Sequence, residues 1–186
     1  KISRSDFLNN SNSFSVNSTF PSSTNVALST INYVSKPVDT AILGYYLFDE
    51  NEYGLINALN WNQDNKSILT DVDIKDNKTI WTILKSKGIT SNNIQPKDLI
   101  KSALSEYIYK DSHQIAYKDT DELNEIISDS SVLDNRFNFI DYPNIDISAH
   151  VFGVGSEEWH KEIDIFEIIL LLHVRGRKLI SQKSLL

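Results

Sequence analysis

Two short groups of polar residues in this chain have the side chains that bind divalent cations. The first group is Asp49 and Asn51, and the second is Asp71, Asp73 and Lys75. Carboxylate and amide oxygens are the ligands that Ca²⁺ and Mg²⁺ take in proteins. A lysine beside a metal ion can also position an attacking water. The chemistry open to these residues is therefore cation binding or metal-assisted hydrolysis.

The first group follows part of the spacing of an EF-hand calcium loop. Asp49 stands at position 1, Asn51 at position 3 and Gly54 at position 6, where that loop turns sharply. Tyr53 at position 5 offers no carboxylate or amide oxygen, and Asn60 replaces the bidentate Glu of position 12. A β-turn explains the same residue types. The calcium alternative is an extracellular, calcium-stabilised binding module whose ligands are Asp49, Asn51 and Asp64.

The second group resembles half of the motif of the PD-(D/E)xK nucleases. Asp73 and Lys75 have the D-x-K spacing, Asp71 lies two residues earlier, and all three are at the end of a predicted strand. The resemblance implies a Mg²⁺-dependent nuclease in which these residues are catalytic and Asp49 or Asp64 supplies the missing first acid. Residues 1–118 hold 12 basic and 12 acidic side chains, so this region has no evident track for DNA.

Other catalytic arrangements are missing from the sequence. The chain has no Cys, which excludes disulfides, thiolate metal sites and cysteine nucleophiles. It has no serine elbow, and Gly153 and Gly155 lack the third glycine of a dinucleotide loop. A Zn²⁺ site at His150 and His160 with Glu157, Glu158 or Glu162 requires residues 145–174 to form a β-hairpin, and solvent-facing or hydrogen-bonded histidines are the simpler interpretation. We therefore predict no catalytic residue, no cofactor and no metal.

The net charge of −7 and the pI of about 5.0 exclude a general nucleic-acid binder. The charge is unevenly spread, because residues 119–167 hold 2 basic and 13 acidic side chains, whereas 175–186 hold 4 basic and none acidic. The acidic stretch and the basic end can form ion pairs with each other, with a neighbouring copy or with another partner. The alternative is that the acidic stretch is only a face in contact with solvent. At the basic end, the residues predicted to interact with a partner are Arg175, Arg177 and Lys178. Contact of this end with phosphate also stays open.

The first 25 residues differ in composition from the rest. Ser and Asn fill 13 of these 25 positions, interrupted by isolated Phe7, Phe14 and Phe20. Such a stretch cannot bury enough apolar surface to offset its ordering entropy, so we expect an extended or flexible arm. Its phenylalanines can dock on a neighbouring subunit or on the chain's own domain. The arm would precede a single domain over 26–174 and a basic tail over 175–186.

The rest of the sequence predicts an α+β domain that begins with a β-meander. Residues 40–48 and 55–61 are expected to form a hairpin, and 26–34 and 67–74 to form further strands. Capping residues and helical spacing predict two to three central helices, with a short strand at 113–117 among them. These helices cover 76–87, Pro96 to Ile108, and 119–127. Gly88 is expected to follow the first in the left-handed conformation, and Asp119 or Thr120 to start the third.

The C-terminal third favours a β-hairpin. Apolar and polar residues alternate over 145–151, and 163–174 holds five Ile or Val in twelve residues. A helix that starts after Ser156 competes with the second strand, because Glu157 and Glu158 would fill its first turn and basic residues its end. Short apolar runs do not decide between these two structures by period alone.

The leading hypothesis is a non-catalytic structural or interaction protein that acts by assembling into a larger complex, such as a virus or phage particle. The N-terminal arm, the charge switch and the long apolar segment 163–174 are all features that a protein partner would satisfy. The longest uncharged apolar run has seven residues, far fewer than the roughly 18 to 20 of a membrane span. A soluble protein is expected, and its compartment stays open, with a virion and the extracellular space as two options. The nuclease and the calcium module are the alternative functions.

Overall fold

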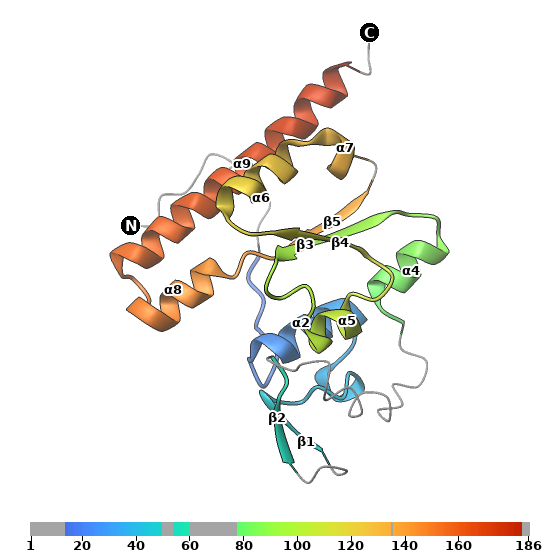
Figure 1. Cartoon of the computed structure of the whole chain (residues 1–186), viewed down its shortest axis with the longest axis vertical. Coiled ribbons are helices and arrows are strands. Elements are labelled where there is room, and N and C mark those ends of the chain that lie inside the picture. Colours follow the sequence, from blue (N-terminus) through green and yellow to red (C-terminus); the bar gives the residue numbers. More distant parts are fainter. Residues whose placement is uncertain (1–13, 50–53, 60–77, 135, 184–186) are drawn as a thin grey trace. The chain divides into compact units, whose positions relative to one another are not determined.

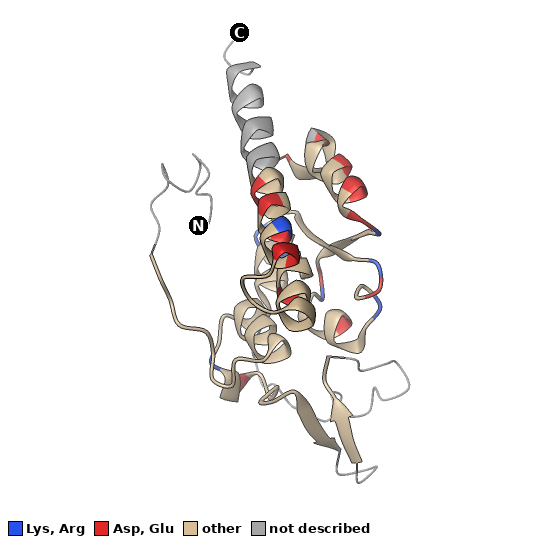
Figure 2. Ribbon diagram, turned by 90° about the vertical axis from the view of Figure 1, so that its left-hand side faces the viewer, with Lys and Arg blue, Asp and Glu red and all other residues tan. Residues whose placement is uncertain are grey.

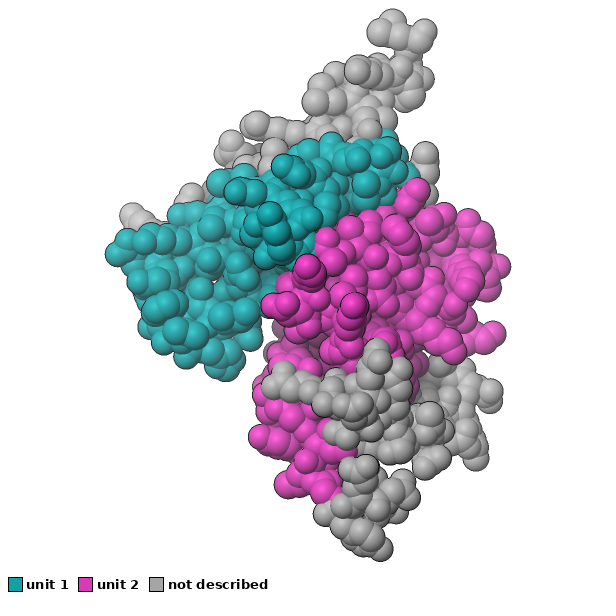
Figure 3. Space-filling view, in the orientation of Figure 1, with its two compact units in different colours: residues 1–15, 117–135, 140–186 teal, residues 16–116, 136–139 magenta. Residues whose placement is uncertain are grey.

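The computed structural model describes residues 14–49, 54–59, 78–134 and 136–183, with the backbone alone at 49, 130 and 171–183 (Figure 1). The chain divides into two compact units (Figure 3). Unit 1 contains residues 1–15, 117–135 and 140–186, and unit 2 contains 16–116 and 136–139. The mixture of helices with two small sheets confirms the predicted α+β class. The predicted domain boundaries stay predictions.

Unit 2 opens with the helix α2 (Thr24–Tyr33), where a strand was predicted. The 3₁₀ turn η1 (Pro37–Asp39) follows it. The buried residues of α2 repeat with the helical period, but three of the five are polar, which hides the pattern in the sequence. They are Asn25, Val26, Ser29, Asn32 and Tyr33. The first element of the predicted β-meander is therefore wrong.

The predicted hairpin is confirmed, with shorter strands than expected. Strands β1 (Tyr46–Asp49) and β2 (Gly54–Asn57) pair antiparallel in their own two-stranded sheet. Phe48 lies opposite Leu55 in this ladder, and Leu47 lies opposite Ile56. The predicted strand 67–74 lies outside the described residues.

A three-stranded sheet forms the centre of unit 2, apart from two terminal residues that belong to unit 1. Its order is β4-β3-β5, from β3 (Ser91–Pro96), β4 (His113–Tyr117) and β5 (Phe137–Ile140). Strand β4 confirms the prediction at 113–117, whereas β3 and β5 were not predicted. Helix α4 (Ile80–Ser86) confirms the first central helix, and Gly88 after it has the expected left-handed φ of 71°.

Helix α5 (Ala103–Ile108) is shorter than the helix predicted from Pro96. Pro96 instead ends strand β3, and Ser102 caps α5 by accepting a hydrogen bond from the Ser105 N–H at 3.1 Å. Proline is tolerated at the first helical position but also at a strand end, so it does not fix the element that it borders.

Unit 1 is mainly helical. It contains α6 (Thr120–Ser128), α7 (Ser130–Leu133), α8 (Asn144–Phe152) and α9 (Glu157–Lys183). Both α6 and α8 pack against α9, and several Asp and Glu positions lie along α6 and the first turns of α9 (Figure 2). Of the two residues predicted to start α6, Asp119 is the cap, because its carboxylate accepts a hydrogen bond from the Glu122 N–H at 3.0 Å. No helix in the described part of the chain is long and apolar enough to cross a membrane.

The predicted C-terminal β-hairpin is wrong, because 144–152 and 157–183 are helices. Ser156 caps α9 by accepting a hydrogen bond from the Trp159 N–H at 3.1 Å, as the helical alternative required. In α8 the buried residue is Ser148, whereas Ile147 and Val151 are exposed. The apolar residues that alternate in the sequence therefore do not mark one buried face, and the strand interpretation of 145–151 fails for that reason.

The carboxyl group of Asp141, in unit 1, predicts how the stability of the protein depends on pH. Burial raises the pKa of its carboxyl above the ordinary value, and the Tyr117 hydroxyl donates a hydrogen bond to its backbone oxygen at 2.7 Å. A raised folded pKa means that the charged form opposes folding, so stability from this group increases as pH falls through that pKa. We expect Asp141→Asn to raise the melting temperature at neutral pH, with a gain that shrinks toward the ordinary Asp pKa. Circular dichroism melts across pH measure this.

The matched control is the exposed Asp121, on the first turn of α6. Asp121→Asn removes the same charge without relieving any burial, so it should give no such gain. A gain from Asp141→Asn that is constant with pH would contradict the assignment.

Candidate functional site

One face of the β1–β2 hairpin is apolar and open to solvent. Cross-strand partners point to the same face of a sheet, which places Phe48 beside Leu55. Phe48 is 58% exposed, Leu55 72% and Tyr46, two residues along β1, 57%. The opposite face holds the pair of Leu47 and Ile56, and Ile56 is buried. We call Tyr46, Phe48 and Leu55 the hairpin face.

A second exposed apolar region lies where α2 ends. Val34 caps this helix in the left-handed conformation, with φ 50° and ψ 41°, although its side chain is 68% exposed. This conformation costs an L-residue about 1–2 kcal/mol, and β-branched side chains adopt it rarely. Strain of this kind gathers at functional surfaces, which draws attention to the end of α2.

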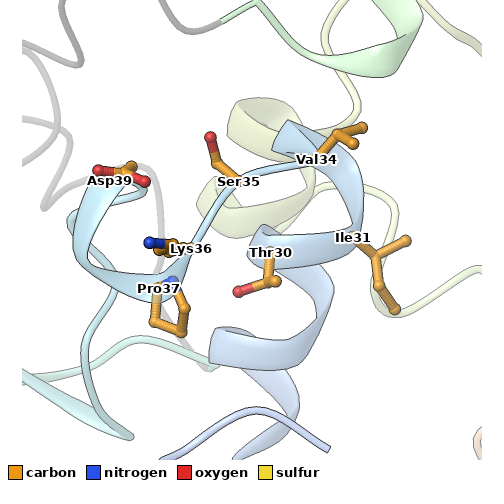
Figure 4. A pocket seen from close by; sticks show the side chains of 7 residues that line it. All are labelled: Thr30, Ile31, Val34, Ser35, Lys36, Pro37 and Asp39. Atoms are coloured by element: carbon orange, nitrogen blue, oxygen red, sulfur yellow. The ribbon is translucent and has the colours of Figure 1, made fainter. Parts of the chain in front are cut away.

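The end of α2 and the η1 turn enclose an open pocket of about 650 Å³ (Figure 4). The Thr30 hydroxyl is buried beside it without a hydrogen-bond partner among the described residues. Ile31 and Val34 supply exposed apolar surface, and Lys36 supplies the one cationic group of the lining. The complete lining is Thr30, Ile31, Val34, Ser35, Lys36, Pro37 and Asp39.

A polar network lies on one face of the three-stranded sheet. The buried Asn92 donates a hydrogen bond from Nδ2 to Asn138 Oδ1 at 2.8 Å, and its Oδ1 lies 3.2 Å from His113 Nδ1. Arg136 donates from Nη1 to the same Oδ1 at 3.5 Å. Each of the three strands thus contributes a side chain, and β3 in the middle supplies the amide that joins them.

The Asn92 amide orients the ring of His113. An amide oxygen accepts hydrogen bonds, so the contact favours the tautomer with the proton on Nδ1 and leaves Nε2 as an acceptor. An oriented histidine is one half of a nucleophile–base pair. Within the described residues, the His113 ring hydrogen-bonds to this amide and not to a nucleophilic side chain. The network therefore links the three strands of the sheet near their ends.

Asp111 forms a separate link between α4 and the loop before β4. Its carboxylate accepts hydrogen bonds from Lys85 Nζ at 2.6 Å and from Thr82 Oγ1 at 2.9 Å. These donors hold the pKa of Asp111 below its ordinary value. Asp111 has a φ of 73°, which aspartate tolerates better than most residues. This ion pair ties α4 to the loop before β4.

Most residues predicted to bind metal or to catalyse lie outside the described residues. This holds for Asn51, Asp64, Asp71, Asp73 and Lys75, whereas Asp49 ends strand β1. The calcium and nuclease sites therefore stay predictions. The described residues contain no group of three or more His, Asp or Glu side chains placed to hold a metal ion.

The predicted zinc alternative is wrong in its geometry. His150 lies on α8, with Nε2 3.6 Å from the Asp146 carboxylate, and His160 lies on α9 with Nδ1 2.7 Å from the Ser156 carbonyl oxygen. Both histidines therefore bond within their own helix region. A shared site needed the β-hairpin that these two helices replace.

The predicted interaction residues fall into three groups. Phe14 and Phe20 belong to a segment without helix or strand and are almost fully exposed, at 87% and 94%. Arg175, Arg177 and Lys178 lie on the last turns of α9. Phe7 lies outside the described residues.

Sequence reasoning missed the hairpin face and the end of α2. The sequence held a signal for the hairpin face, because apolar residues stand at consecutive positions within 40–48 and so point to both faces of the strand. A two-stranded hairpin has no further element of its own to cover both faces, so one apolar face is left open. The left-handed Val34 gave no signal, since glycine or asparagine usually marks such a cap. Comparison of the chain with protein-family models, curated proteins and solved structures found no match.

Proposed function

We propose that this protein acts without catalysis, as an interaction protein that assembles into a larger complex through the hairpin face. The observation that supports the proposal is the exposure of Tyr46, Phe48 and Leu55 together on one side of a single hairpin. Scattered exposed apolar residues need no explanation, but large ones gathered on one face mark interaction surfaces. Aromatic residues are also enriched at such contacts.

The end of α2 supports the same proposal within unit 2. Ile31, Val34 and Val38 are exposed there. Val34 also adopts the left-handed cap conformation, which costs free energy for a β-branched residue. The exposed Phe14 and Phe20 add contact residues of the same chemical kind. A protein surface is the partner that suits large apolar side chains with few charges among them.

The test is the double variant Phe48→Lys with Leu55→Lys, in the full chain. Placing two like charges opposite each other on the hairpin face should weaken association by about tenfold or more, because burial of the two side chains is lost and each lysine must be desolvated. Sedimentation velocity over a concentration series measures the change, and circular dichroism confirms that the fold is kept.

The matched control is Ile147→Lys with Val151→Lys, which introduces the same two charges at exposed apolar residues of α8. This control should associate like the unmodified chain. Equal association of the double variant and the unmodified chain would refute the role of the hairpin face.

A further inference from the structure

Two side chains that can carry positive charge meet at one amide oxygen in unit 2. His113 Nδ1 lies 3.2 Å from Asn92 Oδ1, and Arg136 Nη1 donates to the same oxygen at 3.5 Å. Asn92 has no exposed surface and its Nδ2 donates to Asn138 Oδ1, so the oxygen that both side chains approach is held in place. We call Asn92, His113 and Arg136 the Arg–His cluster.

Arg136 has no carboxylate partner among the described residues. Its side chain is half-buried, and the hydrogen bond that the described residues give it is the long contact with the uncharged Asn92 oxygen. A guanidinium group always carries its charge and has five N–H donors. A charge that is partly removed from water costs free energy unless an opposite charge pairs with it. The charge of Arg136 and most of its donors are therefore open to a ligand.

The part of unit 2 that builds the three-stranded sheet is positively charged, against the trend of the whole chain. Residues 78–116 and 136–139 hold seven basic and three acidic side chains, a net charge of +4, whereas the chain carries −7. Asp111 is the acid that precedes His113 most closely in the chain, and its carboxylate is already paired with Lys85 at 2.6 Å. A local excess of positive charge attracts anions to this part of the surface.

The exposed ring of His113 adds a donor that depends on pH. The Asn92 oxygen favours the proton on Nδ1, so in the neutral ring Nε2 is an acceptor, which an anion avoids. In the protonated ring Nε2 becomes a donor as well, and the ring carries a positive charge. The ordinary pKa of histidine, about 6.5, places this change close to neutral pH. The cluster therefore offers one permanent positive charge and a second one in mild acid.

We propose that the Arg–His cluster binds a phosphate group, either as the free ion or as a monoester. A phosphate group carries about 1.5 to 2 negative charges at pH 7 and has three oxygens that accept hydrogen bonds. It can therefore pair with a guanidinium and an imidazolium at once, whereas a carboxylate has a single charge to share between them. This inference goes beyond the proposed function, because it makes no use of the hairpin face.

Titration of the full chain with inorganic phosphate, methyl phosphate and acetate, followed by NMR chemical shifts, tests the ligand class. At pH 6 at least one of the two phosphates should bind about tenfold or more tightly than acetate, because acetate has one negative charge. The phosphate that binds more tightly identifies the source, free ion or monoester. Acetate that binds as tightly as both phosphates would overturn the proposal, as would the absence of any shift with either phosphate.

Arg136→Gln should weaken phosphate binding by about tenfold, because it removes the permanent charge of the cluster. The matched control is Lys97→Gln, which removes the same charge from an exposed residue just past the other end of β3, roughly 16 Å along the strand direction from Asn92. It should change the affinity by less than about twofold, since screening is strong over that distance. Circular dichroism confirms that both variants keep the fold. Equal weakening in the two variants would overturn the proposal, because it indicates a general effect of charge.

The pH dependence of binding tests His113 separately. Sulfate is the probe, because its charge is constant where phosphate and histidine titrate. Sulfate should bind about fivefold or more tightly at about pH 5.5 than at about pH 8. Among the charged groups beside the ring, Arg136 keeps its charge in this range, and so does Asp111, whose pKa is held below its ordinary value by Lys85 and Thr82. His113→Gln does not titrate and should abolish the dependence; a dependence that survives this substitution would overturn the proposal.

Discussion

Replacement of Trp81 by alanine is expected to lower the free energy of unfolding by about 3–5 kcal/mol, which is the usual cost of deleting a fully buried aromatic ring. Trp81 has no exposed surface, and its ring contacts those of Tyr109, Phe137 and Phe139 edge-on, with centroids 5.7–6.1 Å apart. Trp81 belongs to α4, Tyr109 directly follows α5, and both phenylalanines belong to β5. The cavity left by the substitution would therefore weaken the packing between these three parts of unit 2. Urea denaturation followed by circular dichroism measures the change.

A second variant separates the hydrogen bond of Trp81 from its packing. The indole Nε1 donates to Asn32 Oδ1 at 2.6 Å, between two buried residues. Trp81→Phe keeps most of the apolar volume but leaves the Asn32 oxygen unpaired, so a smaller loss of about 1–3 kcal/mol is expected. Tyr46→Ala on the exposed hairpin face is the control and should stay within about 0.5 kcal/mol. A Trp81→Ala loss as small as that of this control would contradict the assignment of Trp81 to the core.

The elements that sequence analysis predicted correctly are those with local signals. Asp119 caps α6, and Gly88 ends α4 in the left-handed conformation, and both features act within a few residues. Polar turn residues between two runs of strand formers identified the β1–β2 hairpin. Capping and turn formation depend on neighbours in the chain, so the sequence alone is enough for them.

The incorrect elements depended on what other parts of the chain cover. Asn32 is buried in α2 because Trp81, 49 residues later, donates a hydrogen bond to it, and no local pattern contains that information. The central strand β3 has buried polar residues, since Asn92 bonds to side chains of both neighbouring strands. Helix α9 is apolar around most of its circumference over 168–174, which matches a buried strand as well as a helix. Tertiary contacts decided these three cases.

The candidate site shows the same division. The sequence indicated a protein that acts through contacts, but it placed them on an N-terminal arm, a basic tail and a long strand. The hairpin face requires knowing that only one side of the hairpin, with Ile56, is buried.

Replacement of Asn93 by leucine is expected to stabilise the protein. Asn93 lies in the central strand with no exposed surface, and neither Nδ2 nor Oδ1 has a hydrogen-bond partner among the described residues. Burying an unpaired polar group costs about 1–3 kcal/mol, and an apolar side chain of similar size removes that cost. We expect a gain of about 1–3 kcal/mol in the free energy of unfolding, measured by urea denaturation.

Asn92 supplies an unusually close control, because it is the same residue type, one position earlier and equally buried. Neighbouring residues of a strand point to opposite faces, so the two asparagines meet different surroundings. The Asn92 amide bonds to Asn138 and to the His113 ring, and Asn92→Leu would leave these groups without that partner. It should therefore destabilise the protein by about 1–3 kcal/mol, the opposite sign to Asn93→Leu. Two losses of equal size would show that Asn93 is hydrogen-bonded in solution.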